Sequence, residues 1–182
     1  MKSLIVTLTL SVCGSIIALP SSSSAAQISA QVAESGYSLP LALAVEAATT
    51  AIDACKAKGW PVSAFVVDTS GVTKVHLKGD HSTIHTKDSA FQKAYTVVTF
   101  GPIFGFDRTS AFAELVSKNP AGASSAVYSL PNITILPGGV AIKRGNEIVA
   151  GLGVGGSPGG DRDEGCALEG VAKIADRVNV DR

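Results

Sequence analysis

The first apolar pattern that follows the N-terminal segment has the period of an amphipathic helix. It begins near Ser38, and Gly59 with Pro61 ends it. Its apolar positions are Leu41, Val45, Ala48, Ile52 and Cys55. We therefore expect a helix that buries this face against the rest of the domain.

Alternating or β-branched segments with turn residues between them predict two β-hairpins. Their four arms are 62–67, 72–77, 140–143 and 148–154. Asp68-Thr69-Ser70-Gly71 provides the turn of the first hairpin, and Arg144-Gly145-Asn146-Glu147 provides the turn of the second. The apolar run 133–136 also favours a strand. Adjacent hairpins indicate an antiparallel sheet covered by helices, which is a mixed α/β (α+β) fold.

Three further stretches have helical spacing. One starts at Thr86, which can cap it, and is expected to end at Gly101-Pro102. A shorter helix is predicted over 109–117, and a last one from Asp163 to Val178.

The first 26 residues have the layout of a secretory signal peptide. Lys2 precedes an apolar stretch, 4–19, which is followed by Pro20 and small residues that suit cleavage before Gln27. A retained membrane anchor is the alternative, but the stretch is shorter than the roughly 20 apolar residues of a spanning helix. We therefore expect residues 27–182 to form one domain, without a membrane span, in the periplasm or outside the cell.

Charge and cysteine content narrow the possible partners. The chain has 15 Lys and Arg against 15 Asp and Glu, so no basic excess favours nucleic acid. Cys55 and Cys166 follow the signal peptide and can pair in an oxidising compartment, although the sequence leaves their pairing open. The single methionine is Met1, so metal ligands in the domain must be of another type.

Three histidines are candidate ligands. His76 lies in an alternating strand that turns it toward solvent, and we do not choose it. His81 and His85 lie in the irregular segment 79–86, between a strand and a helix, where scaffolds often hold ligand-binding groups. The alternative, which the residues alone favour, is a pair of solvated loop histidines, because most loop histidines bind nothing.

Two other patterns are better explained by structure than by chemistry. Gly151, Gly153 and Gly156 match G-x-G-x-x-G, but only one helix follows them, so no βαβ unit can form. These glycines are expected to allow a tight passage from strand to helix. Asp163 and Glu164 are expected to interact with the start of the last helix.

Several motifs in order along the chain resemble the GlcG/HbpS-like proteins. They are Phe65-Val66-Val67-Asp68-Thr69-Ser70-Gly71, Gly79-Asp80-His81, His85-Thr86-Lys87-Asp88-Ser89-Ala90, Lys93-Ala94-Tyr95-Thr96, Leu136-Pro137-Gly138-Gly139-Val140, Gly151-Leu152-Gly153-Val154-Gly155-Gly156 and Asp163-Glu164-Gly165-Cys166-Ala167. The resemblance runs from about Ser38 to Val178. It implies a profilin-like, five-stranded antiparallel sheet flanked by helices, and a homo-oligomer.

The resemblance also implies haem, or a related tetrapyrrole, as the ligand. His85 and Thr86 match a Pro-His-Thr motif of secreted relatives, which makes His85 the first candidate for the iron ligand, while His81 is a second candidate. Lys93 is a candidate partner for a haem propionate, and Tyr95 a candidate for apolar cover.

Three functions follow from the resemblance. The first is an exported haem-binding protein for uptake, sensing or protection, with iron bound by a loop histidine. The second is an enzyme that degrades haem or acts on a small organic acid. The third is a non-catalytic oligomeric module that binds a corrinoid or a protein partner.

Overall fold

The computed structural model describes residues 35–118 and 130–180, so the expected signal peptide lies outside the described residues. Its helices are α1 (Leu41–Lys56), α2 (Thr86–Phe104), α3 (Thr109–Lys118) and α5 (Gly160–Val178), and its strands are β1 (Ser63–Asp68), β2 (Thr73–Lys78), β3 (Gly139–Arg144) and β4 (Glu147–Gly155). All strand pairs are antiparallel, in the order β2-β1-β4-β3. Both predicted hairpins are therefore confirmed.

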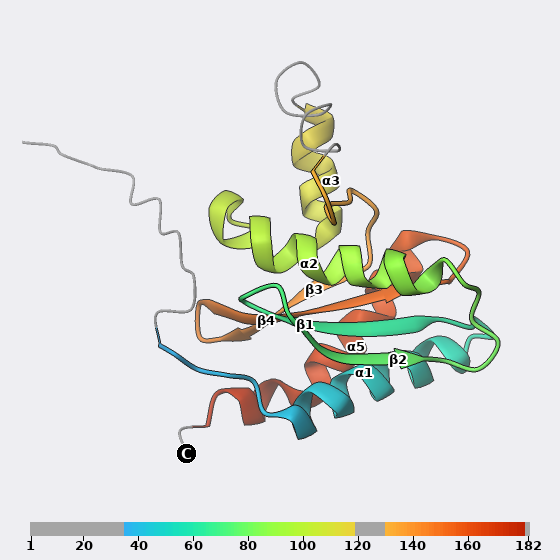
Figure 1. Ribbon diagram of the computed structural model, residues 1–182, viewed down its shortest axis with the longest axis horizontal. Helices are drawn as coiled ribbons and strands as arrows, with labels where there is room; N and C mark the ends of the chain where they lie inside the picture. Colours follow the sequence, from blue (N-terminus) through green and yellow to red (C-terminus); the bar gives the residue numbers. More distant parts are fainter. Residues whose placement is uncertain (1–34, 119–129, 181–182) are drawn as a thin grey trace, which may run out of the picture.

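The sheet lies between two layers of helices. Figure 1 shows α2 along one face, with α3 extending away from the sheet on that side, and α1 with α5 along the other face. Each face has its own hydrophobic cluster because successive side chains of a strand point to opposite faces. The mixed α/β class predicted from the pattern is confirmed.

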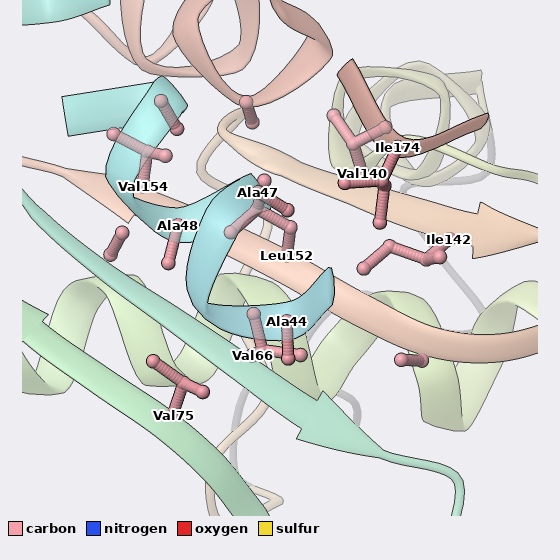
Figure 2. Packing of buried hydrophobic residues seen from close by; sticks show 14 of the residues in the cluster. Ala44, Ala47, Ala48, Val66, Val75, Val140, Ile142, Leu152, Val154 and Ile174 are labelled. Atoms are coloured by element: carbon pink, nitrogen blue, oxygen red, sulfur yellow. The ribbon is translucent and has the colours of Figure 1, made fainter. Parts of the chain in front are cut away.

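Helix α1 is where the pattern predicted it, but its buried face is different. Leu41 is 59% exposed, whereas the small residues Ala44, Ala47, Ala48 and Ala51 are fully buried. Figure 2 shows Ala44, Ala47 and Ala48 against the strands that carry Val66 and Leu152. Tertiary packing explains the difference, because α5 crosses α1 so closely that a Cβ atom on Gly170 would lie 2.4 Å from the Ala47 carbonyl oxygen. Small residues are required at this crossing, and larger ones turn outward.

The glycines of β4 serve helix packing rather than the passage from strand to helix. A Cβ atom on Gly153 would lie 2.0 Å from the backbone oxygen of Ala90, and one on Gly151 would lie 2.5 Å from that of Ala94. Both carbonyls belong to α2. Because Gly151 and Gly153 have no side chain, α2 lies directly on β4. Of the three glycines, only Gly156 (φ 131°) serves the turn that follows the strand.

Helix α2 continues past the predicted stop at Gly101-Pro102. Pro102 lacks an N–H and crowds the preceding turn, but ring packing of Phe100 and Phe104 against Phe112 holds the additional turn. The helix ends instead at Gly105, which has φ 72° and donates its N–H to the Gly101 carbonyl.

The run 133–136 is buried in part but forms no strand, so the prediction of a strand there was wrong. Asn132 has φ 66°, and the Thr134 N–H donates to the Thr96 hydroxyl on α2 at 2.9 Å, where a strand would require a backbone partner. The sheet of the described residues consequently has four strands. The five-stranded, profilin-like description stays a prediction.

Candidate functional site

A pocket of about 480 Å³ lies beside the open end of the β1–β2 hairpin, where β1 begins and β2 ends. Its lining residues come from the last turns of α1, the connection to β1 and the loop after β2, and are Ile52, Lys56, Gly59, Trp60, Pro61, Val62, Gly79, Asp80 and His81. Aliphatic and indole groups provide most of this lining. Lys56, Asp80 and His81 add polar groups at one side, a combination typical of small-molecule sites.

The loop that carries His81 is fixed to β1 by backbone contacts. The Gly79 N–H donates to the Val62 carbonyl at 3.0 Å, and a Cβ atom on Gly79 would lie 2.4 Å from that same oxygen. Ser82 N–H then donates to the Gly79 carbonyl and closes a turn with His81 at its third position. His81 has φ 65°, a conformation in which glycine or asparagine is usual. Such strain, when held by its surroundings, is frequent at ligand sites.

A chain of buried hydroxyl groups anchors the other end of this loop. The Thr86 hydroxyl donates to the Thr83 carbonyl at 2.6 Å, and this uses its only proton. The Ser63 hydroxyl, 2.8 Å away, must therefore donate to Thr86, and Ser82 must donate to Ser63 at 3.1 Å. Thr86 is fully buried, so it positions the loop and offers no group to a ligand. It also lies inside α2, whose N-cap residue is His85, so the prediction of a Thr86 cap was wrong.

We predict that Thr86→Val lowers the free energy of unfolding by about 1–3 kcal/mol, because it removes two hydrogen bonds of a buried hydroxyl, one with Ser63 and one to the Thr83 carbonyl, which then keeps only the longer bond from the Thr86 backbone N–H. Urea denaturation of the purified variant measures this loss. Thr83→Val, at an exposed side chain of the same loop, is the matched control, with an expected change within about 0.5 kcal/mol. Equal losses in the two variants would contradict the hydroxyl chain.

Two cationic side chains make cation–π contacts with the Trp60 ring beside the pocket. The Arg162 guanidinium on α5 lies 5.2 Å from the ring centroid, and the Lys58 ammonium lies 5.8 Å from it. Lys58 also binds Glu169 at 2.9 Å. Cation–π contact therefore holds positive charge at the aromatic wall of the pocket.

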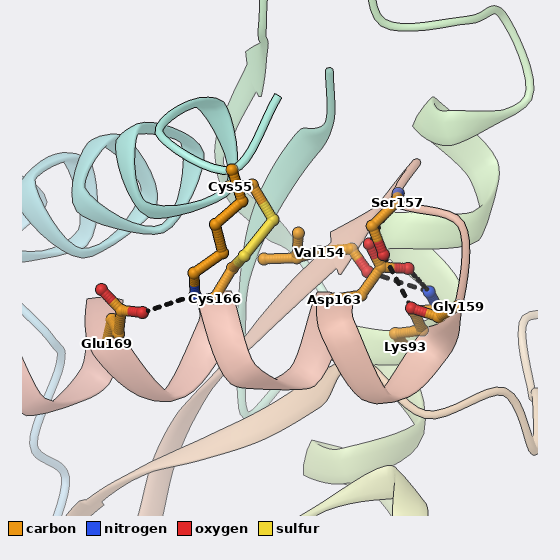
Figure 3. Close-up of a disulfide and its surroundings, with 9 residues drawn as sticks. Cys55, Lys93, Val154, Ser157, Gly159, Asp163, Cys166 and Glu169 are labelled. Atoms are coloured by element: carbon orange, nitrogen blue, oxygen red, sulfur yellow. Dashed lines mark hydrogen bonds and ion pairs between the residues drawn. A yellow bond between two sulfur atoms is a disulfide. The ribbon is translucent and has the colours of Figure 1, made fainter. Parts of the chain in front are cut away.

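A disulfide joins the two elements that carry Trp60 and Arg162. Cys55 at the end of α1 is bonded to Cys166 on α5, and both are fully buried (Figure 3). The pairing that the sequence left open is thus formed. Trp60 N–H donates to the Cys55 carbonyl at 3.0 Å, and Arg162 is one helical turn before Cys166. The covalent link therefore fixes the tryptophan and the arginine relative to each other.

The other predicted site residues do not line this pocket. His85 is exposed at the start of α2, with its Nδ1 3.1 Å from the Thr83 hydroxyl. Tyr95 lies at the opposite end of the hairpin, where its ring would meet a Cβ atom on Gly71 at 2.9 Å. The structure brings His81 to the pocket and leaves His85 and Tyr95 outside it.

Lys93 is part of a buried ion pair and does not line the pocket. Its ammonium lies 2.6 Å from the Asp163 carboxylate and 3.0 Å from the Val154 carbonyl, and both side chains of the pair are less than 5% exposed (Figure 3). Asp163 also accepts the Ser157 N–H. The acidic residues expected to interact with the start of the last helix thus serve tertiary contacts instead, since the neighbouring Glu164 accepts two hydrogen bonds from Ser110 at the start of α3.

His76 is exposed, as predicted, and is stacked on an aromatic residue. Its ring lies 4.1 Å from that of Phe65, the cross-strand partner on β1. Partial desolvation of the imidazole lowers the pKa of His76 below its usual value, and the positive charge of Lys87 lowers it further. The imidazole is on the α2 face of the sheet and is not among the residues that line the pocket.

Two kinds of feature are absent from the part of the chain that the structure describes. Residues 35–118 and 130–180 contain no cluster of three or more His, Cys, Asp or Glu residues that could hold a metal ion. In the same ranges no helix is long and apolar enough to cross a membrane.

Sequence reasoning missed Trp60, Lys56 and Arg162. Trp60 is the only tryptophan of the chain and follows a helix stop, which is a usable signal for an aromatic residue at the edge of the core. No local pattern could place Arg162 beside it, because the two are joined only through the packing of α5.

Comparison with known proteins identifies the family. The family described as haem degrading protein HbpS-like matches residues 39–172, which is more than half of the chain. No sequence among the curated proteins matches the chain.

Among solved structures, HbpS is 34% identical with a TM-score of 0.68, over 76% of this chain and 91% of that one. A double mutant of Streptomyces reticuli HbpS is 35% identical with a TM-score of 0.68, over 76% and 88% of the two chains. PduOC, solved as a complex with haem, is 21% identical with a TM-score of 0.67, over 76% and 96%, which shows the shared fold alone. The chain belongs to the HbpS-like haem-degrading protein family.

Proposed function

We propose that this protein is an exported haem-binding protein whose pocket beside Trp60 receives the porphyrin, with His81 as the iron ligand. The observation that carries the proposal is that one loop histidine and the only tryptophan of the chain line the same pocket. The choice of haem as the ligand is supported by the family match, because the family is described as haem degrading.

The donor set of the pocket fits haem. Iron accepts an imidazole nitrogen, and His81 provides one from a loop that is held to β1. Trp60, Ile52 and Val62 give apolar cover for a macrocycle. Bound there, haem would supply redox and oxygen chemistry, while the chain supplies position and surroundings.

Geometry favours His81 over His85 as the ligand. His81 lines the pocket, and its positive φ directs the loop through an unusual backbone conformation. His85 is an exposed N-cap residue beside Thr83 and lies outside the lining residues. A bis-histidine site would need both imidazoles in one place, and the loop as described does not bring them together.

The Cys55–Cys166 disulfide supports the export part of the proposal. Structural disulfides persist in oxidising compartments such as the periplasm and the extracellular space. The signal-peptide layout of residues 1–26 agrees with it. Homo-oligomerisation, implied by the family resemblance, is part of the same proposal.

The test is a haemin titration of the purified domain, followed by absorption spectroscopy. We expect a saturable Soret band in the native protein. His81→Asn keeps a residue that tolerates positive φ but removes the imidazole, so the band should shift and the affinity fall at least about tenfold, a difference of about 1.4 kcal/mol.

His85→Asn is the matched control, because it makes the same chemical change in the same loop outside the pocket. It should leave the spectrum unchanged. A spectrum that responds to His85→Asn and not to His81→Asn would assign the iron to His85. No saturable band in the native protein would overturn haem binding altogether.

The family description favours haem degradation as a second candidate function. With reductant and oxygen, an enzyme would consume the Soret band and release a stoichiometric product. Catalase must be present, because free peroxide also bleaches haem. Loss of the band that His81→Asn does not slow would show that the bleaching occurs away from the pocket.

A further inference from the structure

Arg162 carries an unpaired positive charge at the edge of the pocket. It lies in the first turn of α5, its side chain is exposed, and its guanidinium is over the Trp60 ring at 5.2 Å. Within residues 35–118 and 130–180, no carboxylate lies within ion-pair distance of this guanidinium. The aromatic contact holds the side chain in one place and leaves its N–H donors available.

The other two cations of this region already have carboxylate partners. Lys58 binds Glu169 at 2.9 Å, and Lys56 lies 3.7 Å from Asp80. These pairs neutralise both lysines across a surface that is otherwise open to solvent. Among these three cations, Arg162 is therefore the one whose charge would most favour binding of a negatively charged ligand.

We propose that Arg162 recognises a carboxylate of the ligand, which for a porphyrin is a propionate. The planar guanidinium matches a carboxylate with two parallel hydrogen bonds, and stacking on an aromatic ring orients it without engaging these donors. The inference rests on the proposed haem site, and it adds a preference for porphyrins with free carboxylates over porphyrins without them.

The experiment compares three porphyrins in one detergent-containing buffer: haemin, its dimethyl ester and metal-free protoporphyrin IX. The native protein should bind haemin about tenfold or more tighter than its dimethyl ester, the usual scale of a charge-assisted hydrogen bond. Arg162→Gln should lose about the same factor for both free acids and nothing further for the ester. This non-additivity is the signature of a direct contact.

Lys58→Gln is the matched control, because it removes one positive charge beside the same tryptophan from a side chain that already has a partner. It should leave all three affinities nearly unchanged. Equal losses for acid and ester in Arg162→Gln would mean that the arginine acts through the packing of Trp60, which overturns the inference and leaves the haem site intact.

The metal-free acid separates the two proposals. Binding of protoporphyrin that depends on Arg162, without a histidine-dependent Soret shift of haemin, would support carboxylate recognition and remove the His81 ligand. Absence of binding by both free acids would overturn the haem site and the role of Arg162 together.

Discussion

Lys93→Met is expected to lower the free energy of unfolding by about 3–5 kcal/mol, because it leaves the Asp163 carboxylate buried without its counter-ion. The methionine fills a similar volume, so lost charge pairing dominates the effect. The pair joins α2 to α5 across the end of β4, where Lys93 also donates to the Val154 carbonyl. Urea denaturation followed by circular dichroism measures the loss.

Two controls separate the ion pair from other effects. Lys87→Met removes a charge from an exposed position of the same helix and should change stability by less than about 0.5 kcal/mol. Lys93→Met combined with Asp163→Asn leaves no buried charge, while the amide oxygen can still accept the Ser157 N–H, so it should recover part of the loss. A double variant no more stable than Lys93→Met would show that the pair is not the cause.

The fold was predictable where local pattern and tertiary packing agree. Turn residues separate the two strands of each hairpin, and the spacing of apolar residues differs clearly between strands and helices. The elements and their antiparallel pairing therefore followed from the sequence. Prediction failed where tertiary packing determines which face of a helix is buried or where the helix ends. Gly170 against Ala47 determines which face of α1 is buried, and the rings around Phe112 extend α2 past Pro102.

The site was predictable only as a segment. The sequence singled out the loop between β2 and α2, and His81 in it lines the pocket. Thr86 and Lys93 were chosen for their chemistry, yet both are fully or nearly fully buried and engaged with neighbouring groups. Burial depends on long-range contacts such as those of Lys93 with β4 and α5, which a local pattern does not contain.

The disulfide connects stability with the geometry of the pocket. Cys55 and Trp60 are joined by a backbone hydrogen bond, and Arg162 and Cys166 are on one face of α5. The Arg162–Trp60 contact is thus bridged by a covalent bond between elements that are distant in the sequence. A ligand that needs both side chains meets them already positioned, which reduces the entropy lost on binding.

Replacing both cysteines in Cys55→Ala/Cys166→Ala is expected to lower the free energy of unfolding by about 3–5 kcal/mol. The link closes a loop with a sequence separation of 111 residues, and removing a loop closure of that size restores much conformational freedom to the unfolded chain. Urea denaturation of both proteins under non-reducing conditions measures the difference. Native protein refolded in excess reductant should match the double variant, because both then lack the cross-link.

The same double variant tests the coupling to the pocket. If the disulfide holds Arg162 against Trp60, then Arg162→Gln should cost less haemin affinity in the cysteine-free background than in the native one, because part of the prepositioning is already lost. Equal costs in the two backgrounds would show that packing of α1 on α5 suffices to place the arginine. The disulfide would then contribute stability alone, and its loss in a reducing compartment would leave recognition of the carboxylate unchanged in the protein that remains folded.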